Sequence, residues 1–317
     1  METEQLETRK IAEYEAIKLV NKNDNNAIEL IPGYGGRLNG LWLSDKSVQQ
    51  NVIDGYQDDK DLLDDTYYHN VWLFPFINRL EAGAYKFEGN KYQFPINEPE
   101  RGNALHGFLF NQAFEVEEIG SVGMIPFIKL KYQYDGEYSY YPFPFDLSIT
   151  YKLIVSNILE IEVNMKNTGE KNAPLSFGWH PYFTFNQNIQ NVKVTIPAQQ
   201  RVAVNQNLIP TGELIKDDRF LKGRAVLSDQ LDDNFKLESF ENYKVTLSSD
   251  QGHAQIMMEF DRSMKYIQMF TPPKRKSIAI EPVTSNINAF NNGDGLMKIE
   301  PGQSFSTTFK IMLTRTI

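Results

Sequence analysis

The stretch Leu147-Ser-Ile-Thr-Tyr-Lys-Leu-Ile-Val155 alternates between two kinds of side chain. Its odd positions carry only aliphatic or aromatic residues, and polar Ser148, Thr150 and Lys152 stand between them. Successive side chains of a β-strand point to opposite faces, so a period of two predicts a strand with one buried face. This stretch therefore favours a sheet protein in which one face of the sheet covers a core.

The same period recurs along the chain, separated by turn-forming dipeptides and tripeptides. Alternating segments are Ile128–Tyr134, Ile161–Met165, Val192–Ile196 and Phe309–Leu313, and turn signals are Asp135-Gly136, Asn167-Thr-Gly169, Asp250-Gln-Gly252 and Pro301-Gly302. Many short strands at regular spacing are typical of an all-β sandwich. We found no repeat and no linker-like break, and we expect one large antiparallel domain over residues 1–317.

Three segments do not indicate a single secondary structure as clearly. Residues 4–20 have a helix-friendly composition, but Tyr14–Val20 equally suits a first strand. The acidic stretch Asp58–Asp65 suggests a loop with one helical turn. Pro32–Arg37 is glycine-rich but lacks the full spacing of a dinucleotide-binding loop, so we expect a tight turn between strands.

Composition excludes several classes of protein. The formal net charge of −9 argues against a nucleic-acid partner, which needs a basic footprint. The chain has no cysteine, so disulfides, a thiolate nucleophile and Cys-ligated zinc are excluded. No run of 18 apolar residues is present, so we expect no membrane segment. The N-terminal residues have no apolar signal-like stretch, and we expect a cytoplasmic protein.

Two of the four histidines stand in unusual surroundings. His106 lies in Gly102-Asn-Ala-Leu-His-Gly107, and His180 lies in Phe177-Gly-Trp-His-Pro-Tyr-Phe183. Glycine, proline and aromatic neighbours suit a chain corner beside a stacking surface, although a hydrogen-bonded core histidine fits about as well. His69 and His253 lack such surroundings, and we expect structural or exposed positions for them. The wide spacing of the four gives a metal site little support.

Glu281 is the outstanding carboxylate, because it follows the apolar run Ser277-Ile-Ala-Ile280 and precedes a proline. A buried glutamate is costly unless it is paired or useful, but a strand-end charge facing solvent is equally plausible. Arg79 interrupts an apolar run and suits either an ion pair or a donor fork for ligand oxygens. A glutamate base, a histidine acid and many aromatic rings together suit a sugar site.

These motifs resemble the aldose 1-epimerase (mutarotase) family. The matching segments, in the order of the family, are Gly35–Leu38, Asn78–Gly83 with Phe87–Gly89, Asn103–Gly107, Tyr141–Phe145, Phe177–Phe183, Leu231–Phe235, Ile267–Pro272, Ile280–Thr284 with Ala289 and Asn291, and Pro301-Gly302. The resemblance covers about residue 27 to the C-terminus and covers residues 1–26 poorly. It implies a large antiparallel β-supersandwich of the galactose mutarotase-like type with a sugar cleft on one face.

The resemblance also implies the roles of individual residues. Glu281 would be the general base and His180 the general acid that open and reclose a hexose ring, with no cofactor and no metal. The implied substrate-binding residues are Asn78, Arg79, His106, Asp232 and Gln268. The family often has a histidine where this chain has Asp233, so either Asp232 or Asp233 could face the cleft. We expect a monosaccharide, either free or phosphorylated, as the ligand, and a monomer or homodimer.

Three other functions remain open from the sequence. A hexose-6-phosphate epimerase would need a cationic clamp, for which Lys274-Arg-Lys276 or Arg101 are candidates. A non-catalytic carbohydrate-binding protein could use the same fold. A glycoside hydrolase would need two carboxylates flanking the glycosidic oxygen, which the single well-placed glutamate fits less well.

Overall fold

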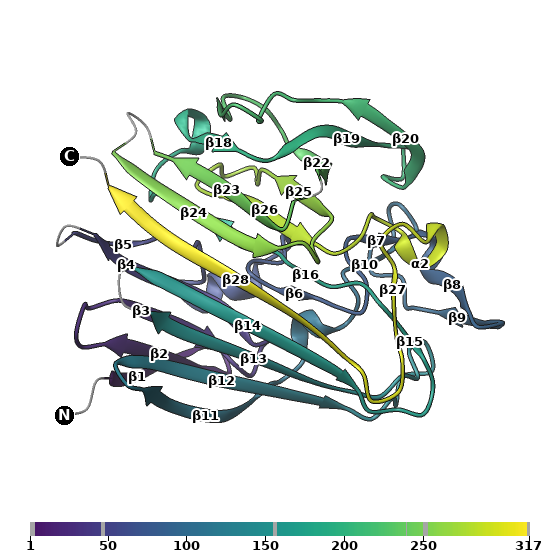
Figure 1. Ribbon diagram of the computed structural model, residues 1–317, viewed down its shortest axis with the longest axis horizontal. Coiled ribbons are helices and arrows are strands. Elements are labelled where there is room, and N and C mark those ends of the chain that lie inside the picture. The colour runs from purple at the N-terminus through teal and green to yellow at the C-terminus, as the bar shows by residue number, and fades with distance from the viewer. Residues whose placement is uncertain (1–3, 46–47, 155–156, 239, 250–252, 316–317) are drawn as a thin grey trace.

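The computed structural model describes residues 4–45, 48–154, 157–238, 240–249 and 253–315. Its largest sheet has nine strands and faces the viewer in Figure 1. In spatial order these are β11 (Glu115–Val122), β12 (Ile125–Tyr134), β13 (Phe145–Ile154), β14 (Ile158–Asn167), β28 (Ser304–Arg315), β24 (Ala254–Asp261), β23 (Asn242–Ser248), β18 (Lys193–Thr195) and β21 (Arg224–Ala225).

A second sheet of eight strands carries three of the predicted site residues, Asp232, Gln268 and Glu281. Its order is β20 (Pro210–Lys216), β19 (Ala198–Val204), β22 (Asp232–Leu237), β25 (Tyr266–Phe270), β26 (Ile278–Val283), β16 (Gly178–Trp179) and β6 (Trp72–Leu73), with β17 (Tyr182–Phe183) beside β26. The strands of both sheets pair in antiparallel fashion. The sheets therefore form the antiparallel all-β architecture expected of a mutarotase-like sandwich.

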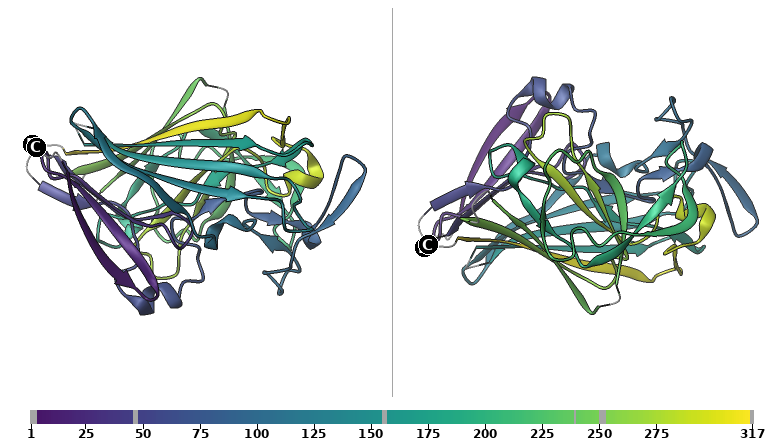
Figure 2. Two further views of the ribbon diagram at one scale, coloured as in Figure 1. Left: turned by 90° about the horizontal axis from the view of Figure 1, so that it is seen from below. Right: turned by 90° about the horizontal axis from the view of Figure 1, so that it is seen from above.

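A third sheet forms the N-terminal part of the chain. It consists of β1 (Glu4–Ile11), β2 (Tyr14–Asn21), β3 (Ala27–Ile31), β4 (Arg37–Asp45) and β5 (Val48–Asn51) in sequence order. Figure 2 shows these purple strands in a different layer from the teal strands of the nine-stranded sheet. The two layers meet where β2 contacts β12 and β4 contacts β28.

Short elements complete the fold. Three two-stranded ribbons pair β7 (Arg79–Leu80) with β10 (Ala104–Leu105), β8 (Ala84–Phe87) with β9 (Asn90–Gln93), and β15 (Ala173–Leu175) with β27 (Met297–Ile299). The helices are α1 (Asp59–Leu63) and α2 (Ala289–Asn292), with 3₁₀ turns η1 (Glu81–Gly83), η2 (Leu109–Asn111) and η3 (Ile189–Asn191). No helix formed by the described residues is long and apolar enough to cross a bilayer.

One continuous core lies between the three sheets. The apolar side chains of the alternating segments enter it: Leu147, Ile149, Tyr151 and Leu153 of β13 are all 0% exposed. Val155, the last residue of that segment, and the turn Asp250–Gly252 lie outside the described residues. The core also contains Leu19 of β2 and Trp179 of β16, so it joins all three sheets.

The structure decides the three ambiguous segments. Residues 4–20 form most of the β1–β2 hairpin and no helix, because β2 pairs with β3 and places Leu19 in the core. The acidic stretch holds the single helical turn α1, whose first turn is capped by the Asp58 carboxylate. Residues 32–36 form a turn that joins β3 to β4, as predicted, and Arg37 is the first residue of β4. That the whole chain is one domain stays a prediction.

Candidate active site

Strands β22, β25 and β26 present one polar face to a common cavity. Gln268 of β25 is the register partner of both Asn234 and Glu281, and Asp232 lies two residues before Asn234 on β22. Residues two apart point to the same side of a strand, so Asp232, Gln268 and Glu281 share that face. Gln268 Nε2 donates to Asp232 Oδ1 at 2.7 Å, which fixes both side chains.

His180 meets Glu281 on this face. Its backbone follows β16, and β16 and β17 both pair with β26, so the turn between them is held directly beside Glu281. His180 Nε2 lies 3.3 Å from Glu281 Oε1. The exposed fractions of the two residues are 5% and 2%. An imidazole and a carboxyl group in direct contact can pass a proton between each other and a bound ligand.

The ribbon of β7 and β10 supplies the opposite wall. Arg79 pairs with Leu105 across the ribbon, and the backbone N–H of His106 donates to the carbonyl of Asn78 at 2.8 Å. Asn78 and His106 both have positive φ angles, which turn the chain sharply at this point. The next residue, Gly107, has no room for a side chain, because a Cβ there would lie 2.0 Å from the carbonyl oxygen of Phe74. The His106 and His180 rings consequently pack edge to face at 5.5 Å.

Arg79 is held in place by a buried carboxylate. Its Nε and Nη2 donate to Glu98 at 2.9–3.0 Å, and its Nη1 donates to Asn78 Oδ1. Glu98 also accepts from Asn103 and from Arg101. Arg79 Nη2 lies 3.9 Å from Asp232, so the guanidinium spans the space between the two walls. The ion-pair prediction for Arg79 is therefore confirmed, and the fork is rigid.

These residues surround a cavity of about 350 Å³. That volume lies within the range of roughly 300–1,000 Å³ typical of small-ligand sites. Aromatic rings of Tyr67, Tyr68, Tyr182 and Phe270 line it together with the polar groups. Ring faces beside convergent hydrogen-bonding groups suit a ligand that has both C–H faces and hydroxyls.

Burial shifts the pKa values of Glu281 and His180 in opposite directions. It raises the pKa of Glu281 well above its ordinary value, and the nearby Asp232 carboxylate adds to the rise. Burial lowers the pKa of His180 to about 3. Both groups therefore favour their neutral forms in the cavity, so the proton resides on the carboxyl group. Burial, together with His180 and Arg79, also lowers the pKa of His106, whose ring stays neutral at physiological pH.

Several polar atoms of the cavity lining are left without protein partners. Among the described residues, nothing bonds to Nδ1 of His106, Nδ1 of His180 or Oε1 of Gln268, although all three are buried. Buried polar groups are normally hydrogen-bonded, and leaving one without a partner costs about 1–3 kcal/mol.

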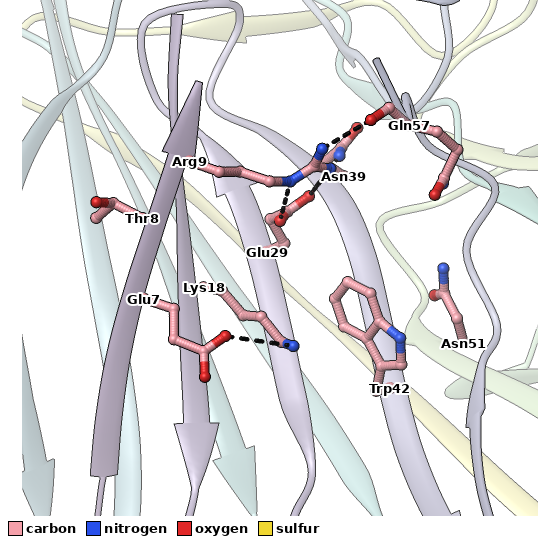
Figure 3. Close-up of a pocket in the computed structure, with 9 residues that line it drawn as sticks. All are labelled: Glu7, Thr8, Arg9, Lys18, Glu29, Asn39, Trp42, Asn51 and Gln57. Carbon is pink, nitrogen blue, oxygen red and sulfur yellow. Dashed lines mark hydrogen bonds and ion pairs between the residues drawn. The ribbon is translucent and has the colours of Figure 1, made fainter. Parts of the chain in front are cut away.

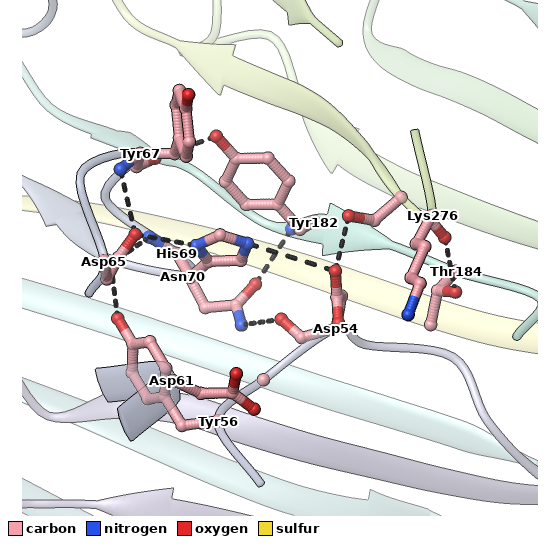
Figure 4. A network of polar contacts seen from close by, with 12 residues as sticks. Asp54, Tyr56, Asp61, Asp65, Tyr67, His69, Asn70, Tyr182, Thr184 and Lys276 are labelled. Atoms are coloured by element: carbon pink, nitrogen blue, oxygen red, sulfur yellow. Dashed lines mark hydrogen bonds and ion pairs between the residues drawn. The ribbon is translucent and has the colours of Figure 1, made fainter. Parts of the chain in front are cut away.

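A second polar network lies behind His180, and Figure 4 shows its members. The Tyr182 ring stacks with His180 at 5.0 Å and with His69 at 4.2 Å between ring centres. His69 Nδ1 lies 2.8 Å from Asp65, and its Nε2 lies 3.9 Å from Asp54. Asp65 accepts further hydrogen bonds from the Tyr56 hydroxyl and from the backbone N–H groups of Tyr67 and His69.

The structure brings all seven predicted site residues together. The cavity lining includes Asn78, Arg79, His106, His180, Asp232, Gln268 and Glu281. It also decides between the two aspartates, because Asp233 points the other way and pairs with Arg219 at 2.9 Å. Arg101 lines the cavity, whereas Lys274, Arg275 and Lys276 do not. The catalytic and binding roles assigned to these residues stay predictions.

Sequence reasoning missed the groups that hold the site in place. Glu98, which holds Arg79, lies in an ordinary acidic loop, Glu98-Pro-Glu-Arg101. Tyr182 stood in a quoted motif, but its stacking with two histidines depends on long-range contacts. No group of three or more His, Asp or Glu within the described part of the chain could hold a metal ion.

Comparisons with known proteins show which family the chain belongs to. A model of the aldose 1-epimerase family matches residues 17–312. The uncharacterized protein YihR of Escherichia coli is 28% identical over 247 residues, which cover 75% of this chain and 77% of that protein. Human galactose mutarotase is 25% identical over 251 residues, which cover 76% of this chain and 70% of that protein.

Solved structures of other proteins are similar to this chain over almost its whole length. A galactose mutarotase-like protein from Clostridium acetobutylicum matches with a TM-score of 0.89 at 21% identity, covering 99% of both chains. Galactose 1-epimerase from Lactobacillus acidophilus matches with a TM-score of 0.82 at 15% identity, covering 100% of both chains. The chain thus has the galactose mutarotase-like fold, and it belongs to the aldose 1-epimerase family.

Proposed function

We propose that the protein is an aldose 1-epimerase that interconverts the α and β anomers of an uncharged hexose. The observation that carries this proposal is the direct contact of Glu281 and His180 in a cavity of sugar size. The C1 hydroxyl and the ring oxygen of a pyranose are attached to the same carbon. Two groups that lie 3.3 Å apart are therefore placed to reach both oxygens at once.

Ring opening moves one proton at each oxygen. Once the proton of the Glu281–His180 pair has moved to His180, the Glu281 carboxylate takes the proton from the C1 hydroxyl, and the electrons of that O–H bond form the C1 carbonyl. The bond between C1 and the ring oxygen breaks, and the His180 imidazolium gives its proton to that oxygen. Rotation about C1–C2 then turns the other carbonyl face toward the freed hydroxyl.

Ring closure reverses the proton transfers. Neutral His180 takes the proton of the attacking hydroxyl, and the Glu281 carboxyl group returns its proton to the carbonyl oxygen. The pair thus carries a single proton that moves from one partner to the other and back. Burial favours this proton on Glu281, which is its position after ring opening. Because the neutral pair is favoured, forming the Glu281 carboxylate and the His180 imidazolium before ring opening costs free energy.

The remaining polar groups would hold the sugar while C1 reacts. His106 and Gln268 offer the buried ring nitrogen and amide oxygen that have no partner among the described residues. Arg79, fixed by Glu98, would donate to hydroxyls on the other side of the ring. Holding the reacting groups in position adds to the effect of acid and base.

Charge balance favours a neutral sugar over a sugar phosphate. The cavity lining contains the carboxyl groups of Glu98, Glu100, Asp232 and Glu281 and the guanidinium groups of Arg79 and Arg101. Both guanidinium groups already pair with Glu98. A phosphate would face more negative than positive charge, and the basic hairpin Lys274–Lys276 does not reach the cavity.

Anomer exchange on a panel of sugars tests the proposal. The rate would be measured by polarimetry and NMR exchange on glucose, galactose, xylose and glucose 6-phosphate, with the spontaneous rate subtracted. We expect Glu281→Gln to lower kcat by about 10²–10⁴-fold, because an amide cannot accept the proton. Glu162→Gln, which changes an exposed carboxylate on β14, is the matched control.

The outcomes separate the competing functions. A Glu281→Gln variant that turns over at the wild-type rate would contradict the assignment of the base. Wild-type protein that binds hexoses without accelerating exchange would identify a carbohydrate-binding protein instead. A preference for glucose 6-phosphate over glucose would contradict the charge argument and favour a hexose-6-phosphate epimerase.

A further inference from the structure

We propose that the outer face of the N-terminal sheet carries a second, non-catalytic site for an uncharged saccharide. This site, which we name the Trp42 cavity, has a volume of about 280 Å³. Figure 3 shows its lining side chains on and beside strands β1 to β5. None of them also lines the cavity around Glu281, so the two sites can be tested independently.

The strand register creates a flat aromatic surface there. Glu7, Lys18, Glu29 and Gly40 are successive register partners across β1 to β4, and Trp42 lies two residues beyond Gly40 on the same face. A Cβ at Gly40 would lie 2.4 Å from the Trp42 ring. The indole therefore lies along the sheet over Gly40, in space that any other residue at position 40 would fill.

Trp42 differs from the other two tryptophans of the chain. Trp72 and Trp179 are 0% exposed and belong to the core. Trp42 is partly exposed and lines a cavity. An aromatic face beside polar groups is the arrangement onto which the C–H face of a sugar ring stacks.

The charged groups of the Trp42 cavity balance one another. Arg9 donates two hydrogen bonds to the Glu29 carboxylate at 2.7 and 2.9 Å. Lys18 Nζ lies 3.6 Å from Glu7 and over the Trp42 ring, 4.7 Å from its centre, so a sugar that stacks on the indole has to displace this partly exposed ammonium group. An anionic ligand would meet two carboxylates, and a cationic ligand would meet a guanidinium and an ammonium group. Balanced charges favour an uncharged ligand.

Neutral side chains complete the hydrogen-bonding surface. Asn51 and Gln57 stand beside the indole and supply amide groups. Asn51 Oδ1 already accepts from the backbone N–H groups of Leu41 and Ile53, which fixes the amide beside the ring. The volume lies just below the range of roughly 300–1,000 Å³ for small-ligand sites, so it suits one sugar ring. That ring could be a free hexose or the terminal unit of an oligosaccharide.

NMR of the tryptophan indole N–H groups tests this proposal site by site. The chain has three such signals, and Trp42→Phe identifies the one from Trp42. Glucose, galactose, maltose and lactose would each be titrated into the full-length protein. We expect a saturable shift of the Trp42 signal, and tighter binding of the disaccharides would identify glycan ends as the preferred source.

Two variants distinguish specific saccharide binding at the Trp42 cavity from a nonspecific change of the Trp42 signal. Gly40→Ala should displace the indole and weaken saccharide binding by about tenfold, while the anomer exchange rate stays unchanged. If Gly40→Ala fails to fold, Trp42→Ala replaces it as the test, because this variant removes the ring. Binding is then measured by saturation-transfer NMR of the sugar. Glu281→Gln should leave the Trp42 shift as it is.

Three results would overturn the proposal. The Trp42 signal could remain still while sugars saturate the Glu281 cavity. Its shift could be the same in Gly40→Ala as in the wild type. It could also respond to inorganic phosphate more strongly than to any sugar, which would indicate an anion site.

Discussion

His180 and His69 stack with the same tyrosine, Tyr182, but their ring nitrogens have different surroundings. The nitrogens of His69 lie 2.8 Å from Asp65 and 3.9 Å from Asp54. Nε2 of His180 lies 3.3 Å from Glu281, and its Nδ1 has no hydrogen-bond partner among the described residues. A polar group whose partners are all supplied by the protein supports the fold, whereas one with a missing partner is available to a ligand.

The largest effect should come from His180→Asn. Loss of the proposed acid should lower kcat for anomer exchange by about 10²–10⁴-fold, measured by NMR exchange at saturating sugar. The melting temperature should change little, because the ring has few bonds to lose. His69→Asn is the matched control, because it changes the other histidine stacked with Tyr182 and should keep most of the activity. Equal loss of activity in both variants would remove the distinction between the two histidines.

An intermediate effect, on stability, should come from Asp65→Asn. Burial alone would raise the pKa of Asp65, but hydrogen bonds from His69 and Tyr56 outweigh it and hold that pKa below its usual value. The carboxylate therefore stabilises the folded state above a pH of about 3.9, and this stabilisation is lost as the pH falls below that value. The variant should lose about 1–3 kcal/mol of unfolding free energy at pH 7 in denaturant titrations.

The kcat of the same Asp65→Asn variant tests whether the polar network around His69 contributes to catalysis or only to stability. Folded Asp65→Asn should retain a kcat close to that of the wild type, because the carboxylate does not line the cavity. A collapse of kcat with unchanged stability would mean that Asp65 acts through Tyr182 on His180.

The smallest effect should be a gain in stability from Glu281→Gln. The raised pKa of Glu281 means that the folded state holds its proton more tightly than the unfolded chain does. Wild-type stability therefore falls as the pH rises above about 4.3, where the unfolded glutamate ionises. The variant lacks this penalty and should melt about 1–3 °C higher at pH 7. The difference should vanish near pH 4, and a variant that melts lower at pH 7 would contradict the burial argument.

Alternation of apolar and polar residues was enough to predict the sheet architecture, and the resemblance to a known family supplied most of the residues that line the cavity. Alternation identified strands such as β13 because each buried side chain is two residues from the next. Glu281 stood out because it follows an apolar run, and the structure places it inside the buried strand β26 and not at a strand end that faces solvent. Asp232 and Asp233 could not be separated until the register of β22 against β25 was known, since adjacent residues face opposite sides.

Long-range contacts account for what could not be predicted. The His69 network joins Asp54 to Ser277, which are 223 positions apart. Glu98 holds Arg79 across a loop with no distinctive composition. Residues 4–20 were ambiguous because their strands are stabilised by pairing with β3 and by packing, and these forces override local helix preference.

The position of β28 has a consequence for how the chain acquires its structure during synthesis. This strand lies between β14 and β24 in the middle of the nine-stranded sheet, yet it follows both of them in the sequence. The halves of the sheet on either side cannot join until the ribosome has released residues 304–315. Until then the edges of β14 and β24 that pair with β28 lack this partner, and we expect this long-range pairing to slow folding and to expose strand edges that favour aggregation.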